Sequence, residues 1–334
     1  MKAPYSPQYF NQMNRHNAIG FHRQQGVAVI MALLLTTLAI TIVASLFWQQ
    51  QVQVRSIENQ RLQLQKQWIL RGALDWAGLI LREDGKHSSL DTLDEPWAVP
   101  LAETRLDQYV ENGRADADIT DSSLSGSISD AQALFNLTNL CVNGTINPSM
   151  VAAFEQMLIN AEIDPSLAQA TADAMASAQI SPATGAANTN TPAKTPDDPL
   201  PINLTQVDDL LAVPGFTPEL LDKLKSLVIF LPRATPINVN TAAAEVLAAG
   251  VAGLSLTNAK LLVEQRNVAN FRDLADFSQR LQSVSLNVSA SNASVTTNFF
   301  LVNGKVRMSR AGLDVKALIE RNSTNTKLIW IREY

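Results

Sequence analysis

The sequence predicts an α+β fold in which a long N-terminal helix packs on a small antiparallel sheet, and a large all-helical domain is inserted between the strands. Three observations predict this fold. An uncharged apolar run at residues 27–47 continues into proline-free, helix-forming sequence up to residue 82. Strand-like alternation flanks a long stretch of helical pattern. The length of 334 residues, with a net charge of −5, suits one or two folded domains behind the helix.

The apolar run at residues 27–47 predicts a transmembrane helix. Roughly 21 residues, rising about 1.5 Å each, cover the hydrocarbon core of a bilayer, which is about 30 Å thick. Polar side chains within such a run can return hydrogen bonds to the helix backbone. In this run they are Thr36, Thr37, Thr41 and Ser45.

Charge predicts how this helix is oriented. Lys2, Arg15 and Arg23 precede the run, and no acidic residue appears before Glu58. By the positive-inside rule the leader is cytoplasmic, so the chain beyond residue 47 lies across the membrane. We therefore expect a single-pass protein of the inner membrane; in a Gram-negative cell its bulk would lie in the periplasm.

A small residue, Gly26, lies directly before the apolar run. In an ordinary secretory signal the apolar stretch is only about 7–15 residues long and the cleavage site follows it. A cut between Gly26 and Val27 would instead leave the apolar segment at the new amino terminus, as an anchor and a packing element. The pattern resembles the class III signal that prepilin peptidase cleaves. The alternative is an uncleaved signal anchor.

The helix is expected to continue beyond the membrane. Residues 49–82 contain no proline, and apolar residues recur there at helical spacing, which predicts an amphipathic second half. These residues are Leu62, Ile69, Ala73, Trp76 and Ile80. The sequence Glu83-Asp84-Gly85 is expected to end the helix, with Gly85 as its cap.

Strand signals occur before and after the helical stretch. Asn303-Gly304 predicts a hairpin between strands at 299–302 and 305–308. A second pair of strands, at 315–319 and 327–331, flanks the polar loop at 322–326. Earlier in the chain, residues 123–129 alternate like a strand and residues 134–137 form a short extended piece.

Helical patterns dominate residues 148–178 and 204–281. A stretch rich in proline, threonine, asparagine and alanine, at 182–201, separates them and predicts a flexible loop. A low-complexity piece at 283–297 is expected to link the insert back to the sheet. The predicted divisions are a leader at 1–26, the long helix at 27–82, a first sheet portion at 83–147, the helical insert at 148–282 and the closing strands at 283–334.

Several segments, in this order and spacing, together resemble the type II secretion minor pseudopilin K family, also called general secretion pathway protein K. They are the residues 23–30 (RQQGVAVI), 135–140 (FNLTNL), 213–216 (VPGF), 235–242 (TPINVNTA) and 299–302 (FFLV). The resemblance implies a pilin-like fold, with a transmembrane N-terminal helix packed on an antiparallel sheet. It also implies processing by prepilin peptidase, which cleaves between Gly26 and Val27 and methylates the new N-terminal Val27.

The family resemblance further implies a role at the tip of the pseudopilus. Such a protein joins minor pseudopilins I and J, starts assembly and caps the tip, for export of folded proteins across the outer membrane. Pseudopilin H and the major pseudopilin are further expected partners. Ala28, Ile30 and Leu34 are expected to pack against partner helices within the membrane.

Met31 occupies the fifth position of the predicted mature chain. Most pilins and pseudopilins carry a glutamate there, which pairs with a neighbour's charged amino terminus, because an unpaired charge in hydrocarbon costs a few kcal/mol or more. A subunit with methionine cannot offer that pairing, which suits the outermost position. The bulky insert also suits a tip rather than a regularly stacked subunit.

Two pieces of the insert resemble helix-hairpin-helix units. Residues 210–224 hold the sequence Val213-Pro214-Gly215-Phe216 at a turn, and residues 237–266 hold Gly253-Leu254-Ser255 between helical halves. In DNA-binding versions basic residues assist phosphate contacts, but residues 208–280 hold 7 Lys or Arg against 8 Asp or Glu. We therefore expect no nucleic acid. The alternatives remain a minor pilin of a type IV pilus and a DNA-uptake pilin whose hairpins bind DNA.

The sequence offers little for metal binding or catalysis. Relatives carry an acidic stretch that suits calcium, but most of those acids are missing here; Asp173, Asp197 and Asp198 are the only candidates for a retained calcium site. No other cofactor is expected. His87 is the sole histidine beyond the leader and is read as an exposed loop residue, so no catalytic constellation is predicted. The single cysteine, Cys141, is interpreted as a small buried apolar residue.

Overall fold

The computed structural model describes residues 25–106, 122–179, 203–281, 292–308, 311–322 and 325–334. The chain forms two compact units, the first ending at Gln63 and the second covering Leu64–Tyr334. One helix, α1 (Gln25–His87), runs through both.

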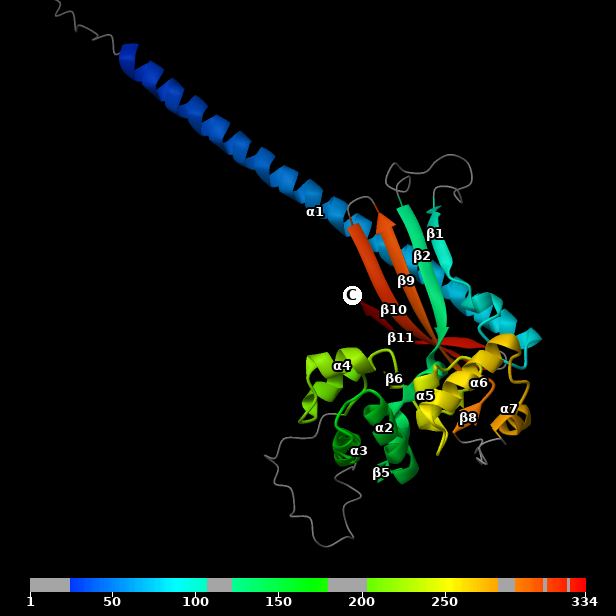
Figure 1. The fold of residues 1–334 in the computed structure, drawn as a ribbon. Coiled ribbons are helices and arrows are strands. Elements are labelled where there is room, and N and C mark those ends of the chain that lie inside the picture. The colour runs from blue at the N-terminus through cyan, green and yellow to red at the C-terminus, as the bar shows by residue number, and fades with distance from the viewer. Residues whose placement is uncertain (1–24, 107–121, 180–202, 282–291, 309–310, 323–324) are drawn as a thin grey trace, which may run out of the picture. The chain divides into compact units, whose positions relative to one another are not determined.

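The second unit is built on a five-stranded antiparallel sheet with the order β1-β2-β9-β10-β11 (Figure 1). Its strands are β1 (Leu101–Arg105), β2 (Ser122–Asp130), β9 (Phe299–Met308), β10 (Ala311–Arg321) and β11 (Thr326–Glu333). The predicted α+β class, the strand at 123–129 and the pairing of the last two strands are confirmed. The sequence reasoning missed β1.

The end of α1 packs on one face of this sheet, inside the second unit. Leu70, Leu74, Ala77 and Leu81 form its buried row. They recur every three or four residues and so lie on one side of the helix. Against β11, the hydroxyl of Thr326 donates to the carbonyl of Gly78 at 3.3 Å, within α1.

The predicted hairpin at Asn303-Gly304 is wrong. β9 runs through both residues without a turn, and Gly304 pairs with Gly126 on one side and Val315 on the other. A Cβ on Gly304 would lie 3.4 Å from the Leu70 side chain. The glycine therefore gives room for helix α1 against the strand, and tertiary packing overrides the local turn preference.

The predicted end and buried face of α1 also need correction. The helix continues through Gly85 and ends at His87, so Gly85 is no cap and His87 is a helix residue rather than a loop residue. Ile69, Ala73 and Ile80 are half-buried on the flanks of the buried row, as is Leu62 further up the helix. Trp76 belongs to the opposite side and is 48% exposed.

The helices of the insert lie between β2 and β9 in the chain. They are α2 (Pro148–Asn160), α3 (Ser166–Gln179), α4 (Pro218–Leu224), α5 (Ala244–Gly250), α6 (Leu256–Val268) and α7 (Leu274–Leu281), with the 3-10 segments η1 (Pro96–Ala98), η3 (Ala131–Ala133), η4 (Leu137–Leu140) and η5 (Val207–Ala212) nearby in the unit. Short strands join them in pairs: β3 (Phe135–Asn136) with β6 (Val228–Ile229), β4 (Cys141–Val142) with β5 (Thr145–Ile146), and β7 (Ile237–Asn238) with β8 (Ala293–Ser294).

Local sequence explains where these helices start. Asn147 caps α2 by accepting from the amide of Ser149 at 3.2 Å, and Pro148 occupies the first helical position. Ser255 caps α6 in the same way through the amide of Asn258 at 3.2 Å. The insert has its own core, in which Phe135 stacks on Phe154 with ring centroids 5.8 Å apart. The predicted loop at 182–201 lies outside the described residues.

Buried hydrogen bonds fasten the insert to the sheet. Asp130, at the end of β2, accepts from Thr241 at 2.6 Å, from Asn238 at 2.8 Å and from the amide of Gln132 at 2.7 Å. Burial raises the pKa of Asp130 to about 6, although these hydrogen bonds oppose the shift. Asn238 also donates to the carbonyl of Asp91 at 3.0 Å. Buried polar groups from segments far apart in the sequence thus hydrogen-bond to one another at the junction between the sheet and the insert.

Candidate functional site

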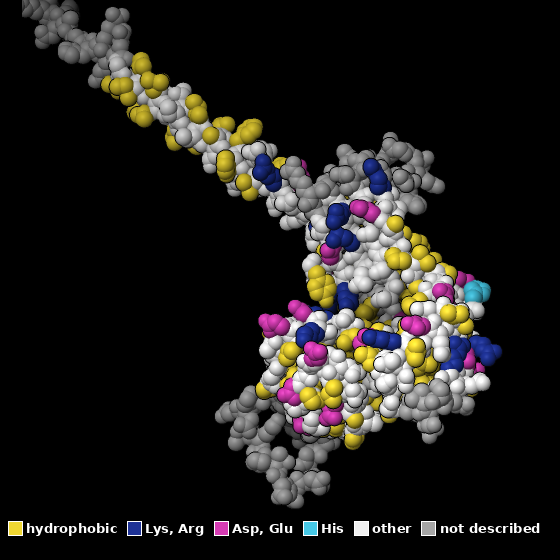
Figure 2. Space-filling view, viewed as in Figure 1, with side chains coloured by type: hydrophobic (Ala, Val, Ile, Leu, Met, Phe, Trp, Pro, Cys, Tyr) yellow, Lys and Arg dark blue, Asp and Glu magenta, His cyan; other side chains and the backbone are white. Residues whose placement is uncertain are grey.

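The first unit presents an apolar helix surface. Every described side chain from residue 26 to residue 57 is exposed, and Figure 2 shows hydrophobic groups along this stretch of helix. Residues 26–54 carry no charge, so the side chains form no ion pair among themselves. A helix that is apolar all round requires lipid or partner helices.

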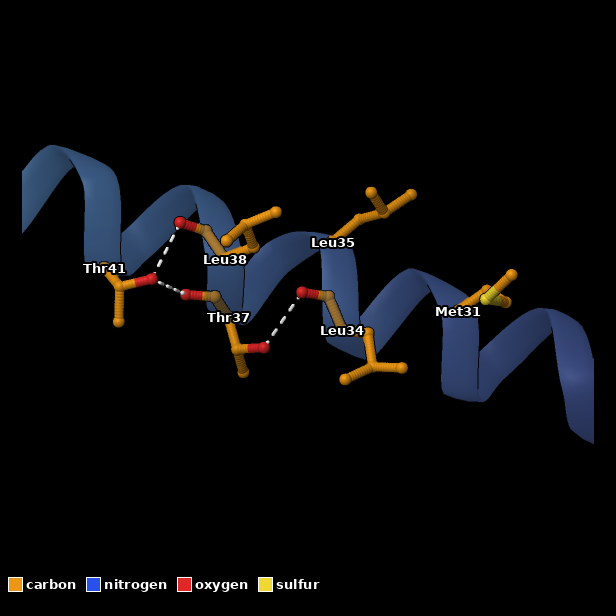
Figure 3. Close-up of a pocket in the computed structure, with 6 residues that line it drawn as sticks. All are labelled: Met31, Leu34, Leu35, Thr37, Leu38 and Thr41. Atoms are coloured by element: carbon orange, nitrogen blue, oxygen red, sulfur yellow. Dashed lines mark hydrogen bonds between the residues drawn. The ribbon is translucent and has the colours of Figure 1, made fainter.

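The threonines in this segment satisfy their own hydroxyl groups, as predicted. Thr37 donates to the carbonyl of Leu34 at 3.0 Å, and Thr41 donates to those of Thr37 at 2.9 Å and Leu38 at 2.8 Å (Figure 3). Thr37 also donates to the carbonyl of Leu33 at 2.9 Å. Thr36 donates to the carbonyl of Leu33 at 2.9 Å. These bonds remove the cost of unpaired hydroxyls in hydrocarbon. This helix is the one among the described residues that is long and apolar enough to span a bilayer.

The predicted assembly residues all lie on this surface. Met31 is 59% exposed and borders a shallow hollow with Leu34 and Thr37 (Figure 3). Gly26, Val27, Ala28 and Ile30 lie in the first turns of α1 and are exposed. A Cβ on Gly26 would meet no atom within 4 Å.

A second apolar surface lies on α1 within the second unit, opposite the buried row. We call it the outer stripe. It consists of Leu64, Trp68, Gly72, Trp76 and Leu79, spaced by four, four, four and three residues. Trp68 is 71% exposed, and the space above Gly72 is open. Two exposed tryptophans on one helix face make this stripe a candidate contact surface, because tryptophan is enriched where proteins associate.

A groove of about 290 Å³ adjoins the outer stripe. Trp76 borders it from α1, Pro96, Trp97 and Val99 border it from η1 and the segment after it, and β2 and β9 close it. Its lining is mostly apolar. The amphipathic pattern groups Trp76 with Ile69, Ala73 and Ile80 and so does not predict the outer stripe or the groove. The spacing of Leu64, Trp68 and Trp76 is the signal in the sequence that could have predicted the stripe.

An ionic network fixes the end of α1 near this groove. Arg321, on β10, donates to Asp84 at 2.7 Å and to Asp91. It also donates to the carbonyls of Leu81 at 3.4 Å and Thr297 at 3.2 Å, and stacks 4.7 Å over the ring of Phe300. All of these groups belong to the second unit, so the network locks α1 to the sheet.

The carboxylates of this network gather closely. One oxygen from each of Asp84, Asp91 and Glu95 lies within 4.8 Å of the others. Burial, together with the charge of Glu95, raises the pKa of Asp84 to about 6 and outweighs the effect of Arg321. Burial likewise raises the pKa of Asp91. Glu95 accepts from Trp97 at 2.8 Å and from the amide of Thr92 at 2.9 Å. Because Arg321 supplies the positive charge, we interpret the cluster as a structural ion-pair network that holds the end of α1 to β10.

The calcium candidates are not brought together in the described chain. Asp173 is exposed on α3 and accepts from Gln169 at 2.8 Å. Asp197 and Asp198 lie outside the described residues. Asp173 by itself offers fewer ligands than the six to eight oxygens that calcium takes. Cys141 is fully buried, as predicted, and its thiol lies 3.6 Å from the Gln179 amide oxygen.

The two predicted hairpin turns are present. Gly215 and Gly253 both have positive φ, at 103° and 80°, which favours glycine. Basic residues close to them serve internal contacts: Lys225 pairs with Asp222 at 3.1 Å, and the buried Arg266 donates to the carbonyl of Ala242 at 2.6 Å. These two cations therefore already have partners within the fold.

Comparison with known proteins shows that this chain is similar to proteins of the type II secretion system. Two family models, both described as type II secretion system (T2SS), protein K, match residues 133–233 and 237–297. Type II secretion system protein K of Pseudomonas aeruginosa is 26% identical over 309 residues, covering 85% of each chain. Among solved structures, a chain in the GspK-GspI-GspJ complex from the enterotoxigenic Escherichia coli type 2 secretion system matches with a TM-score of 0.61 and 19% identity. That match covers 84% of this chain and 99% of the other, and it supports the pilin-like fold.

Proposed function

Because the chain belongs to the type II secretion system protein K family, we propose that it is the minor pseudopilin that caps the pseudopilus tip. It starts assembly with minor pseudopilins I and J, for export of folded proteins across the outer membrane. The solved complex of its structural relative contains GspI and GspJ, which supports this choice of partners. Pseudopilin H and the major pseudopilin would meet the complex later, as the filament grows beneath it.

The single observation that carries the tip position is the neutral surface around Met31. The side chain is exposed, and no acidic residue precedes Glu58. Within hydrocarbon this subunit cannot neutralise the charged amino terminus of a neighbour, and an unpaired charge there is costly. A subunit with no neighbour ahead of it has no need to do so. The proposed head, residues 148–282, is also too bulky for a regularly stacked position.

The outer stripe and the adjoining groove are the proposed surfaces for I and J. Gly72 lets a partner backbone approach α1 closely, and the tryptophans on either side supply large apolar area at little entropic cost. In the membrane, Ala28, Ile30 and Leu34 would pack in the same way against partner helices. These two surfaces explain why α1 is apolar all round in its amino-terminal half, and why its carboxyl-terminal half carries an exposed apolar stripe opposite the buried row.

Processing and orientation complete the proposal. Prepilin peptidase cuts between Gly26 and Val27, and Val27 is then N-methylated. The mature protein is held in the inner membrane with its amino terminus cytoplasmic and its bulk in the periplasm. Mass spectrometry of the N-terminal peptide from membranes tests this step: methyl-Val27 as first residue is expected, and an intact leader would contradict it.

The assembly is tested with the full chain in detergent micelles, mixed with full-length minor pseudopilins I and J. Light scattering should give the mass of a one-to-one-to-one complex. The double variant Trp68→Ala and Trp76→Ala should weaken the complex at least tenfold, since each buried tryptophan at an interface is worth about 2 kcal/mol or more. Val268→Ala is the matched control, because Val268 is 90% exposed on α6 of the insert.

The results of this experiment distinguish the tip assignment from the choice of contact surface. A persistent monomer would remove the tip assignment and return the pilus alternatives. A complex unaffected by the tryptophan variant would keep the assignment and overturn the outer stripe as its contact surface.

A further inference from the structure

A polar row crosses the sheet on the face opposite α1. Arg321 points to α1, so the alternate residues of β10, including Lys316, point away from it. Register places Ser127, Asn303, Lys316 and Arg332 directly side by side across β2, β9, β10 and β11.

Two of these neighbours, Lys316 and Arg332, are cations. Lys316 and Arg332 face each other across β10 and β11, and like charges at directly opposite positions destabilise a sheet. Within the described chain neither makes an ion pair; Arg332 instead stacks 4.3 Å over the Trp330 ring. Burial and the nearby Arg332 lower the pKa of Lys316. By contrast, Lys305 on the same face pairs with Asp314 at 2.9 Å.

The pair lies at a pocket of about 280 Å³ between the sheet and the insert. Figure 2 shows the surface hollowed between the sheet and the helices of the insert. Leu134, Ile229 and Trp330 give the pocket an apolar part, and Lys316 and Arg332 give it a cationic part. The one carboxylate side chain among the described lining residues, Asp208, lies 3.4 Å from Lys225, which also lines the pocket, so that pair adds no net charge. This combination fits a chain segment that carries both an apolar and an acidic side chain.

The outer edge of β11 adjoins this pocket. No described strand pairs with that edge, and Leu328 and Ile331 are exposed along the strand. An extended segment added there would use backbone groups that the sheet leaves unpaired. Its side chains on the pocket face would lie opposite Trp330 and Arg332, two residues apart.

We propose that this pocket binds the side-chain carboxylate of an extended acidic polypeptide segment that pairs with β11. Lys316 and Arg332 hold the carboxylate, and Trp330 receives an apolar residue two positions along the segment. The apolar lining and the free strand edge favour a protein carboxylate over a free anion. This inference is independent of the proposed tip role.

The test uses the full chain in detergent micelles and a fluorescein-labelled peptide of threonine and valine with one leucine and one aspartate two positions apart. Fluorescence anisotropy measures binding. Replacing the peptide aspartate by asparagine should weaken binding about tenfold, as expected for loss of a charge-assisted contact. Lys316→Gln and Arg332→Gln should each weaken it by a similar factor, about tenfold. Lys305→Gln is the matched control and should leave binding unchanged.

Two further measurements test whether the bound partner is an extended polypeptide or a free anion. A peptide methylated on alternate backbone nitrogens should lose binding, and inorganic phosphate should compete only weakly. Equal binding of phosphate and of both peptides would overturn the polypeptide partner in favour of a free-anion site. Absence of binding, or binding that survives Lys316→Gln and Arg332→Gln together, would overturn the pocket itself. Since both substitutions relieve repulsion, melting temperatures at or above that of the unchanged chain are expected.

Discussion

The two ends of α1 differ in where their side chains find partners. From Gly26 to Phe47 the side chains are exposed, and the polar groups bond only to their own helix. From Leu70 to Leu81 one side is buried on the sheet, where β9 and β11 lie more than two hundred residues away in sequence, and Arg321 secures the last turn. One helix thus encodes two kinds of association, one left for lipid and other subunits and one completed within the chain.

Removing the fastening at the carboxyl end should give the largest effect. Arg321→Met leaves Asp84 and Asp91 buried without a cation, and breaking a buried pair in this way costs about 3–5 kcal/mol. Urea unfolding of the full chain in micelles measures the change. Lys305→Met is the matched control, since its pair with Asp314 is exposed and should be worth about 0–1 kcal/mol. Equal losses in the two variants would contradict the structural role of Arg321.

Buried carboxyl groups at this end of α1 and at the junction with the insert should make stability depend on pH. The pKa values of Asp84 and Asp130 are raised to about 6 and that of Asp91 is raised. An acid with a raised folded-state pKa stabilises the fold fully below its unfolded pKa, and this contribution is lost as pH rises through the folded value. The free energy of unfolding should therefore increase as pH falls from about 7 to about 5.

The variant Asp130→Asn sharpens the pH experiment. It removes one titrating group from the junction, so the slope should fall by up to about 1.4 kcal/mol per pH unit in the same window. Thermal unfolding at matched ionic strength gives the slope. A flat profile in the unchanged chain would contradict the burial of these acids.

Alanine substitutions at two glycines compare a packed surface of the protein with an open one. A Cβ on Gly126 would lie 2.6 Å from the backbone oxygen of Asn303, so Gly126→Ala should destabilise the protein by about 1–3 kcal/mol. A Cβ on Gly72 meets nothing, so Gly72→Ala should stabilise it by up to about 1 kcal/mol through helix propensity. Chemical denaturation measures both; a loss for Gly72→Ala would show that the outer stripe is already covered.

Patterns that are local in sequence predicted much of this molecule. The apolar run, the long helix, the strand at 123–129 and the helical insert follow from periodicity and propensity. Asn303-Gly304 misled because its glycine serves packing against Leu70, a contact that no local pattern contains. The partners of Arg321 lie at Asp84 and Asp91, too far along the chain for spacing to predict. The Lys316 and Arg332 pair depends on the register of β10 and β11, which shifts between Leu318 and Ile319, and Arg332 lies just beyond the predicted strand at 327–331.

The register of β2 and β9 has a consequence for how such a chain can change over generations. Asp130 at the end of β2 is paired with Phe300 near the start of β9, so the chain leaves the sheet and returns to it at one point. Coding sequence can therefore be gained or lost between these positions without altering the order of the strands. The helical insert can therefore change in sequence and length independently of the sheet and helix α1.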